Sequence, residues 1–209
     1  IVTVSLSYND VAADIDRMVP AFDKALEAVL TQASGKSSDI EREIFVHDYL
    51  VGTVKYDENA PMNQSAYSAL VGKSSVCAGY SRAFQLIMQK LGIPCYYCTG
   101  QADGGDHAWN IVSIGGACYN VDVSWNDALT TAYSTNTYTY FNVPDSAFEK
   151  DHQRDALSRG LPACTGSALT GSALFSGGTG TDASAAEAPE APWGITSTCS
   201  PPSAAAYPM

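Results

Sequence analysis

The chain has 209 residues, 45% of them hydrophobic and 16% charged, which is the composition of a globular domain long enough to bury a core. Its formal net charge of −11 disfavours nucleic acid and anionic membrane surfaces as partners. No apolar run approaches the ~20 residues that cross a bilayer, and the first residues, IVTVSLSYND, carry no visible signal peptide.

The N-terminal third predicts a short strand and two helices. Alternating β-branched residues indicate a strand at 1–8, and an apolar repeat indicates a helix over about 11–32. Pro20 should kink this helix or divide it, because proline removes a backbone hydrogen bond. The sequence SDIE is a capping-box pattern that opens a second helix, through about residue 51. That helix carries His47, for which we expect a structural role.

Residues 55–71 predict mainly loop, with a short helix at about 65–70. The segment directly precedes a cysteine-bearing helix, so it is a candidate wall of a cleft. Gln64 and Tyr67 are its candidates for a second oxyanion donor.

The stretch SSVCAGYSRAFQLIMQKLGIP predicts that helix, with Ser74 or Ser75 as N-cap and Gly92 as C-cap. Cys77 therefore falls in the first turn, where unpaired N–H groups and the helix dipole lower the pKa of a thiol. The same N–H groups can donate to an oxyanion. From the helix alone, a buried structural cysteine is an equally good interpretation. Tyr80, one turn further on, is a candidate for the site or for the core.

Cys95 and Cys98 have CxxC spacing but lie in a predicted strand, where residues three apart point to opposite faces. This geometry disfavours a redox protein, and no second cysteine pair or histidine cluster completes a zinc site. We interpret both as core thiols. Cys164 and Cys199 are candidates for a disulfide, although the sequence cannot fix the pairing.

Two β-rich runs, DHAWNIVSI and ACYNVDVSW, flank Gly115-Gly116, a strong signal for a two-residue hairpin loop. This loop places Trp109 opposite Asp122 and makes His107 a diagonal neighbour of Asp122 on the same face, about 7–8 Å away. An aspartate that accepts from one imidazole nitrogen leaves the other free to take a thiol proton. Trp109 either shields such a site from water or simply packs. Taken singly, a strand histidine and a turn aspartate remain the alternatives.

The last third predicts less regular structure. Residues 137–143 are strand-like, and 146–157 predict an irregular segment whose His152 we expect at the surface. Beyond residue 165 the chain is rich in Gly, Ala, Ser, Thr and Pro, which predicts an extended tail lying against the domain. We therefore divide the chain into a domain, 1–165, and a tail, 166–209.

Three motifs in their order and spacing, CAGYSRAFQLIMQKLGIPC, DHAWNIV and YNVDVSWND, resemble the transglutaminase-like superfamily of Cys-His-Asp enzymes. The flanking segments HDYLVGTVKYD, SAYSALVGKSSVC and YFNVPDSAFEKDH resemble its bacterial extracellular members, so the resemblance spans residues 39–164. It implies a papain-like fold, with Cys77 as nucleophile, His107 as general base and acid, and Asp122 as the residue that orients His107. It also implies a secreted or cell-surface location.

We thus expect an α+β domain in which helices pack on an antiparallel sheet and the nucleophile lies at a helix N-terminus. The expected function is amide cleavage through a thioester, ending in hydrolysis of peptide or cell-wall-linked amides, because nothing marks a lysine-binding site. One alternative is a crosslinking or deamidating transglutaminase. An alternative of another class is a non-catalytic peptide-binding module of a surface protein. No cofactor is expected, and no metal, since no acidic cluster resembles a calcium loop.

Overall fold

The computed structural model describes residues 14–175. In chain order these form α1 (Ile15–Ser34), α2 (Asp39–Thr53), β1 (Lys55–Tyr56), the π-helical turn η2 (Ser68–Gly72), β2 (Ser74–Ser75), α3 (Cys77–Lys90), β3 (Cys95–Ala102), β4 (Gly105–Ile114), β5 (Ala117–Val121), α4 (Val123–Tyr133), α5 (Asp145–Phe148), β6 (His152–Arg154) and α6 (Gly171–Phe175). Strands β5-β4-β3-β6 form an antiparallel sheet in that order, and β1 pairs with β2 in parallel. The α+β prediction is confirmed.

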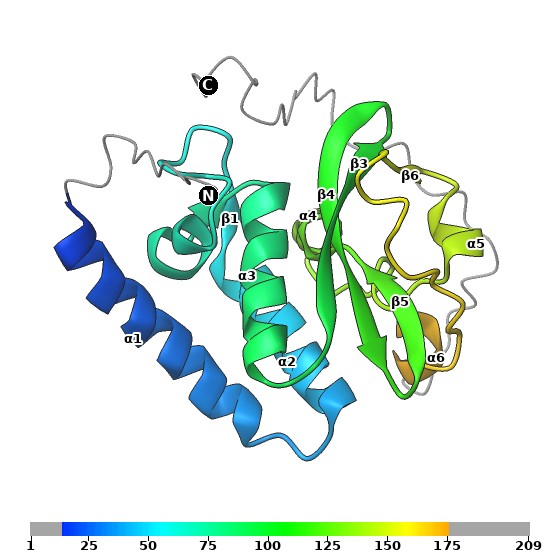
Figure 1. Cartoon of the computed structure of the whole chain (residues 1–209), viewed down its shortest axis with the longest axis horizontal. Coiled ribbons are helices and arrows are strands. Elements are labelled where there is room, and N and C mark those ends of the chain that lie inside the picture. Colours follow the sequence, from blue (N-terminus) through cyan, green and yellow to red (C-terminus); the bar gives the residue numbers. More distant parts are fainter. Residues whose placement is uncertain (1–13, 176–209) are drawn as a thin grey trace, which may run out of the picture.

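Helices cover both faces of the curled sheet. Helix α3 lies along β4 with α1 and α2 beyond it, whereas α5 and α6 lie on the opposite side of the sheet (Figure 1). The main core fills the space between the helices and the sheet, and it includes Phe84, Ile87 and Cys95. A second cluster on the other face includes Cys98. The two cysteines of the CxxC pair therefore enter different cores, as the strand geometry predicted.

Helix α1 runs through Pro20 without a break, so the predicted division is wrong. Pro20 is exposed near the start of the helix, where water can satisfy the carbonyl that loses its partner. The second helix begins as predicted, because the Ser38 hydroxyl accepts from the backbone N–H of Glu41.

Helix α3 begins at Cys77, but the predicted serine caps are wrong. Ser74 and Ser75 instead form β2, and Val76 is the N-cap, without a capping side chain. The Ser75 hydroxyl lies 2.7 Å from that of Ser68 and 2.5 Å from the carbonyl of Asn63, so it joins η2 and the preceding loop to the helix start.

The hairpin has the predicted register as far as β5 extends. Gly115 and Gly116 both have positive φ, 63° and 81°, as the two-residue loop requires, and Asn110 pairs with Val121. The strand then stops at Val121. Asp122 does not continue it: its side chain accepts from the N–H of Trp125 and so caps α4. The predicted strand beyond Asp122 is therefore wrong, because a capped helix replaces it.

The described chain after α4 packs on both cores: Tyr138 and Phe141 contact His47 of α2, whereas Phe148 joins the cluster on the other face of the sheet. The predicted strand at 137–143 is reduced to a single bridge between Val143 and Asn120. Residues 166–175 include α6 and lie against the domain, with Phe175 stacked on Tyr138 at 3.9 Å between ring centroids. The prediction of an extended tail is therefore wrong for this first part, where apolar side chains anchor a short helix. The predicted strand at 1–8 and Cys199 lie outside the described residues.

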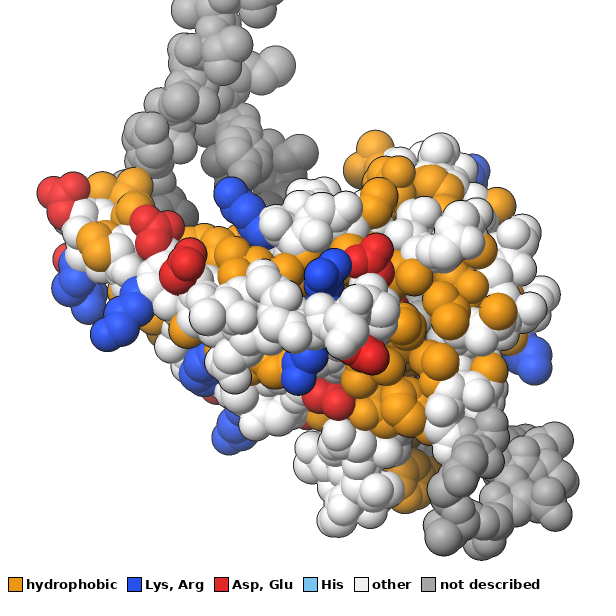
Figure 2. Space-filling view, turned by 90° about the horizontal axis from the view of Figure 1, so that it is seen from below, with side chains coloured by type: hydrophobic (Ala, Val, Ile, Leu, Met, Phe, Trp, Pro, Cys, Tyr) orange, Lys and Arg blue, Asp and Glu red, His pale blue; other side chains and the backbone are white. Residues whose placement is uncertain are grey.

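Figure 2 shows one face of the molecule, on which acidic and basic side chains are interspersed around a band of hydrophobic ones. Within residues 14–175, no helix combines the length and the apolar character needed to cross a membrane.

Candidate active site

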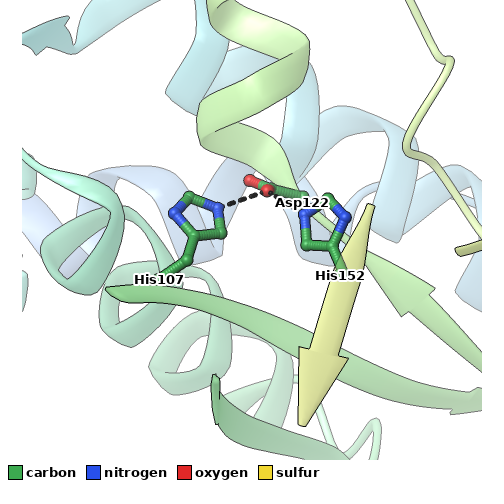
Figure 3. Close-up of side chains that lie close together, drawn as sticks. All are labelled: His107, Asp122 and His152. Carbon is green, nitrogen blue, oxygen red and sulfur yellow. Dashed lines mark hydrogen bonds and ion pairs between the residues drawn. The ribbon is translucent and has the colours of Figure 1, made fainter. Parts of the chain in front are cut away.

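His107 and Asp122 form a direct hydrogen-bonded pair. His107 lies in β4, its side chain 9% exposed, and its Nε2 is 2.6 Å from Oδ2 of the buried Asp122. The two side chains converge from the sheet and from the start of α4, and the other ring nitrogen of His107 faces away from the carboxylate (Figure 3). Because a carboxylate only accepts, Nε2 carries the hydrogen and Nδ1 is left as the basic nitrogen.

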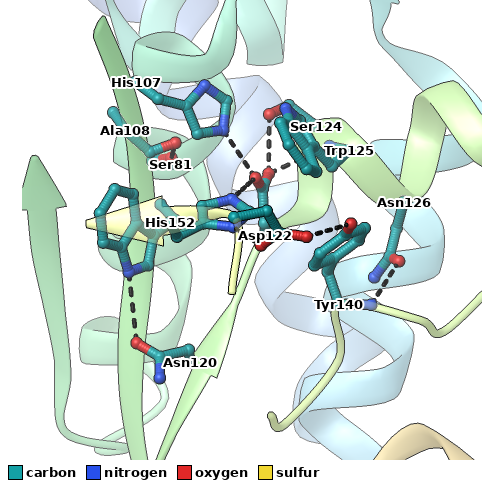
Figure 4. A network of polar contacts seen from close by, with 12 residues as sticks. Ser81, His107, Ala108, Asn120, Asp122, Ser124, Trp125, Asn126, Tyr140 and His152 are labelled. Carbon is teal, nitrogen blue, oxygen red and sulfur yellow. Dashed lines mark hydrogen bonds and ion pairs between the residues drawn. The ribbon is translucent and has the colours of Figure 1, made fainter. Parts of the chain in front are cut away.

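The Asp122 carboxylate is saturated with donors. Its Oδ1 accepts from the Ser124 hydroxyl at 2.8 Å and from the Trp125 N–H at 3.0 Å, as Figure 4 shows. Burial alone would raise the pKa of this carboxyl, but the charges and hydrogen bonds of His107 and His152 outweigh it and hold the pKa well below its usual range. Asp122 is therefore ionised at neutral pH.

His152 is the second histidine on the same carboxylate, so the prediction of a surface position is wrong. Its side chain is fully buried, with Nε2 3.2 Å from Oδ2 of Asp122 and Nδ1 2.5 Å from Oδ1 of Asp151. The burial of His152 could not be predicted from hydrophobic periodicity, because its segment is short and irregular. In the structure, the aromatic rings of Tyr140 and Phe148 enclose the imidazole.

Cys77 begins α3 and lies next to the His107 strand. It is buried in a small apolar cluster with Val76, Ala78 and Ala108, the residue that follows His107. One turn further on, the Ser81 hydroxyl donates to the carbonyl of Ala108 at 3.0 Å, and the side-chain amide of Asn110 donates to the carbonyl of Ser81 at 3.0 Å. These two bonds fasten the first turns of α3 to β4.

A cleft of about 510 Å³ opens beside this junction, and its lining includes His107, Ala78, Ala108 and Gln64. The position of Gln64 is thus compatible with its predicted role. Among the other lining side chains is Leu157, which is 90% exposed at the rim.

The three aromatic candidates lie elsewhere. Tyr67 stacks on Phe22 of α1, with ring centroids 6.2 Å apart, and does not line the cleft. The hydroxyl of Tyr80 is buried and lies 2.6 Å from Asp127 of α4 and 2.9 Å from the carbonyl of Val54, so it belongs to the core. Tyr80 thus takes the core role, the second of the two predicted for it, while Tyr67 packs on α1 and its oxyanion role stays a prediction.

Trp109 is buried behind the histidines rather than in the cleft. Its ring stacks on His107 at 6.3 Å between centroids and meets His152 edge-on at 5.3 Å, while its N–H donates to Asn120. Trp109 therefore packs behind the pair, and its predicted role in shielding the site from water stays a prediction.

Within the described chain, His107, Asp122 and His152 also form the one group of three possible metal-binding side chains, with donor atoms within 4.8 Å of one another. These atoms are already hydrogen-bonded to each other. The expectation that the site needs no metal stays a prediction.

Comparison with known proteins identifies the class. Residues 27–126 match the model of the transglutaminase-like superfamily, so this part of the chain is a transglutaminase-like core domain. The matched residues contain Cys77, His107 and Asp122, whereas His152 lies beyond them.

Among curated proteins, the chain is similar to the kyphoscoliosis peptidases of Mus musculus, 29% identical over 140 residues, and Homo sapiens, 27% identical over 140 residues. Each comparison covers 56% of this chain but 21% of the relative, so the chain spans about a fifth of the relatives' length.

Two solved structures are also similar. A transglutaminase structure is 16% identical with a TM-score of 0.46, covering 57% of this chain and 34% of its own. A protein from Cytophaga hutchinsonii to which cysteine-protease activity is ascribed is 17% identical with a TM-score of 0.47, covering 69% of this chain and 50% of its own.

Proposed function

We propose that this protein cleaves amide bonds with Cys77 as nucleophile, His107 as general base and acid, and Asp122 as the orienting residue. The observation that carries the proposal is the 2.6 Å bond from His107 Nε2 to Asp122, which leaves Nδ1 as the basic nitrogen on a cleft-lining histidine. The neighbourhood of Cys77 and Ala108 supports it, because Ala108 is adjacent to His107 in β4.

In the proposed reaction, the thiolate sulfur of Cys77 adds to the amide carbonyl carbon. The C–N bond then breaks while protonated His107 gives its Nδ1 proton to the departing amine, and a thioester remains. Water adds to the thioester, gives a proton to His107, and releases the carboxylic acid and the thiol group of Cys77. An amine in place of water gives transamidation instead.

The start of α3 supports an oxyanion site. Val76 has no capping side chain, and the N–H groups of Gly79 and Tyr80 both donate to its carbonyl, so the proposed donor is the N–H of Ala78. Ala78, in that first turn, lines the cleft. A developing oxyanion beside the thiol gains hydrogen bonds there that the planar amide does not.

The direct test is the pH dependence of iodoacetamide alkylation at Cys77, with the modified site located by mass spectrometry. Cys118 and Cys199 are replaced by serine, because Cys118 is partly exposed and Cys199 lies outside the described residues. The other thiols provide internal references: burial raises the pKa of Cys98 to about 12 and that of Cys95 well above its usual value.

Rapid alkylation well below pH 8 that His107→Ala abolishes is the expected result. A slow reaction with an ordinary thiol profile, unchanged by His107→Ala, would contradict the proposal and favour the peptide-binding module. Amine release from casein by the wild type but not by Cys77→Ala tests hydrolysis, and incorporation of dansylcadaverine tests the transferase alternative.

A further inference from the structure

The environment of His152 differs from that of an ordinary buried histidine, because both of its ring nitrogens face carboxylates. Nδ1 lies 2.5 Å from Asp151 and Nε2 lies 3.2 Å from Asp122, and the side chain is fully buried. A carboxylate offers no hydrogen, so a neutral imidazole would leave one of these contacts without a donor. Two N–H donors satisfy both, and this requires the imidazolium form.

The aromatic residues around His152 also suit a cation. The ring stacks on Phe148 at 3.9 Å between centroids and lies 4.5 Å from Trp125, 5.3 Å from Trp109 and 5.5 Å from Tyr140. The stacked face of Phe148 attracts a cation at this distance, most strongly where water is absent. Burial alone would lower the pKa of His152, but its bonds and charges with Asp122 and Asp151 outweigh it and raise the pKa.

Asp122 is consequently shared between two imidazoles. Its Oδ2 is the acceptor for both, while Oδ1 is held by Ser124 and Trp125, so the carboxylate cannot rotate away from His107. Further along, the Tyr140 hydroxyl donates to Oδ2 of Asp151 at 2.9 Å and fixes the outer carboxylate. Figure 4 shows this chain of contacts running from His107 through His152 towards Tyr140.

We propose that His152, charged and backed by Asp151, is a positioning residue of the site: it fixes the Asp122 carboxylate and limits how strongly that carboxylate stabilises protonated His107. This inference rests on the proposed function, because His152 acts on Cys77 only through Asp122 and His107. Four titratable side chains face His152: those of Asp122, Asp151, His107 and Tyr140. The two aspartates are negatively charged, and Tyr140 and neutral His107 carry no charge, so none of them repels a charged His152.

The first experiment compares the alkylation profile of Cys77 in wild type and His152→Gln, in the full chain with Cys118 and Cys199 replaced by serine. The alkaline limb of this profile is the pH range in which protonated His107 loses its proton. Removing a cation whose ring centre is 5.6 Å from that of His107 should move this limb to higher pH, by about one unit or more. Asp151→Asn should shift it in the same direction by less, because His152 then keeps one carboxylate.

His47→Gln is the matched control. His47 is equally buried, with Nδ1 2.9 Å from Asp48 and Nε2 2.9 Å from the side-chain amide of Asn126, but it does not touch Asp122. His47→Gln removes an equally buried imidazole, on α2, without changing the charge beside the site. A shift in His152→Gln that His47→Gln lacks is the expected result.

The second experiment does not depend on any variant folding. Imidazole ¹H–¹⁵N NMR of the wild type should show both nitrogens of His152 protonated at pH 7.5. A neutral His152, or an unchanged alkylation profile in His152→Gln while His107→Ala abolishes the activated reaction, would overturn the inference and leave the proposed function intact. An alkylation profile that is the same in wild type and His107→Ala would contradict both the role of His152 and the proposed function.

Discussion

The buried carboxyl of Glu43 makes a sharp prediction about stability. Glu43 lies on α2 with no exposed surface; its Oε2 accepts from the Asn142 side-chain amide at 2.9 Å, and its Oε1 has no partner. Burial, only partly offset by the Asn142 bond, raises its pKa from 4.5 to about 8. The carbonyl oxygen of Asn142 is also unpaired, so a protonated Glu43 has an acceptor available in the same residue.

The sign follows from proton linkage. Between pH 4.5 and 8 the folded chain keeps a proton that the unfolded chain has lost, so the free energy of unfolding falls as pH rises, by about 1.4 kcal/mol per unit at most. Glu43→Gln reproduces the neutral form and removes this dependence. The stability advantage of the variant should therefore grow by about 3 kcal/mol between pH 5.5 and pH 8.

Urea denaturation followed by circular dichroism at several pH values measures this difference. Glu27→Gln, at an exposed position of α1, is the control and should show no comparable growth. A constant difference between wild type and Glu43→Gln across this interval would show that Glu43 is ionised in the folded protein, and would refute the argument from burial.

Three further substitutions test how the site is held. Asp122→Asn should slow alkylation of Cys77 about 100-fold yet retain α4 by circular dichroism, because asparagine caps helices as well as aspartate does; loss of α4 would contradict this separation. Gly79→Ala should lower the urea midpoint, at a cost of about 1–3 kcal/mol, since a Cβ would lie 2.6 and 2.9 Å from two backbone carbonyl oxygens. Gly52→Ala, in open space on α2, should be neutral or stabilising, and equal effects would refute the packing argument. Tyr80→Phe should cost about 1–3 kcal/mol by leaving the buried Asp127 without its donor, and an unchanged urea midpoint would show that this bond adds no stability.

The hairpin illustrates what the sequence could predict. Two consecutive glycines fix a two-residue loop, and the resulting register pairs Asn110 with Val121, which brings the next residue, Asp122, within reach of His107. Local rules suffice because loop, register and side-chain direction all depend on residues that are close in sequence. The same holds for Cys77, whose place at the start of α3 follows from the apolar repeat.

The surroundings of this pair could not be predicted in the same way. His152 reaches Asp122 from 30 residues away, through a three-residue strand that no periodicity marks. At Asp122 the sequence is compatible with two local structures, a continued strand or the N-cap of a helix. The structure has the second, so β5 ends at Val121.

The contacts of Tyr80 explain how residues from separate elements keep their relative positions. Tyr80 lies one turn after Cys77 in α3, and its hydroxyl bonds directly to Asp127 in α4, the helix that Asp122 caps. The helix that carries the thiol is thus tied to the helix that begins at the carboxylate, independently of His107. Since β4 is fastened to the same turns of α3, a displacement of any one element would strain bonds to the other two. Side chains outside the cleft therefore contribute to the precision of the site without touching a substrate.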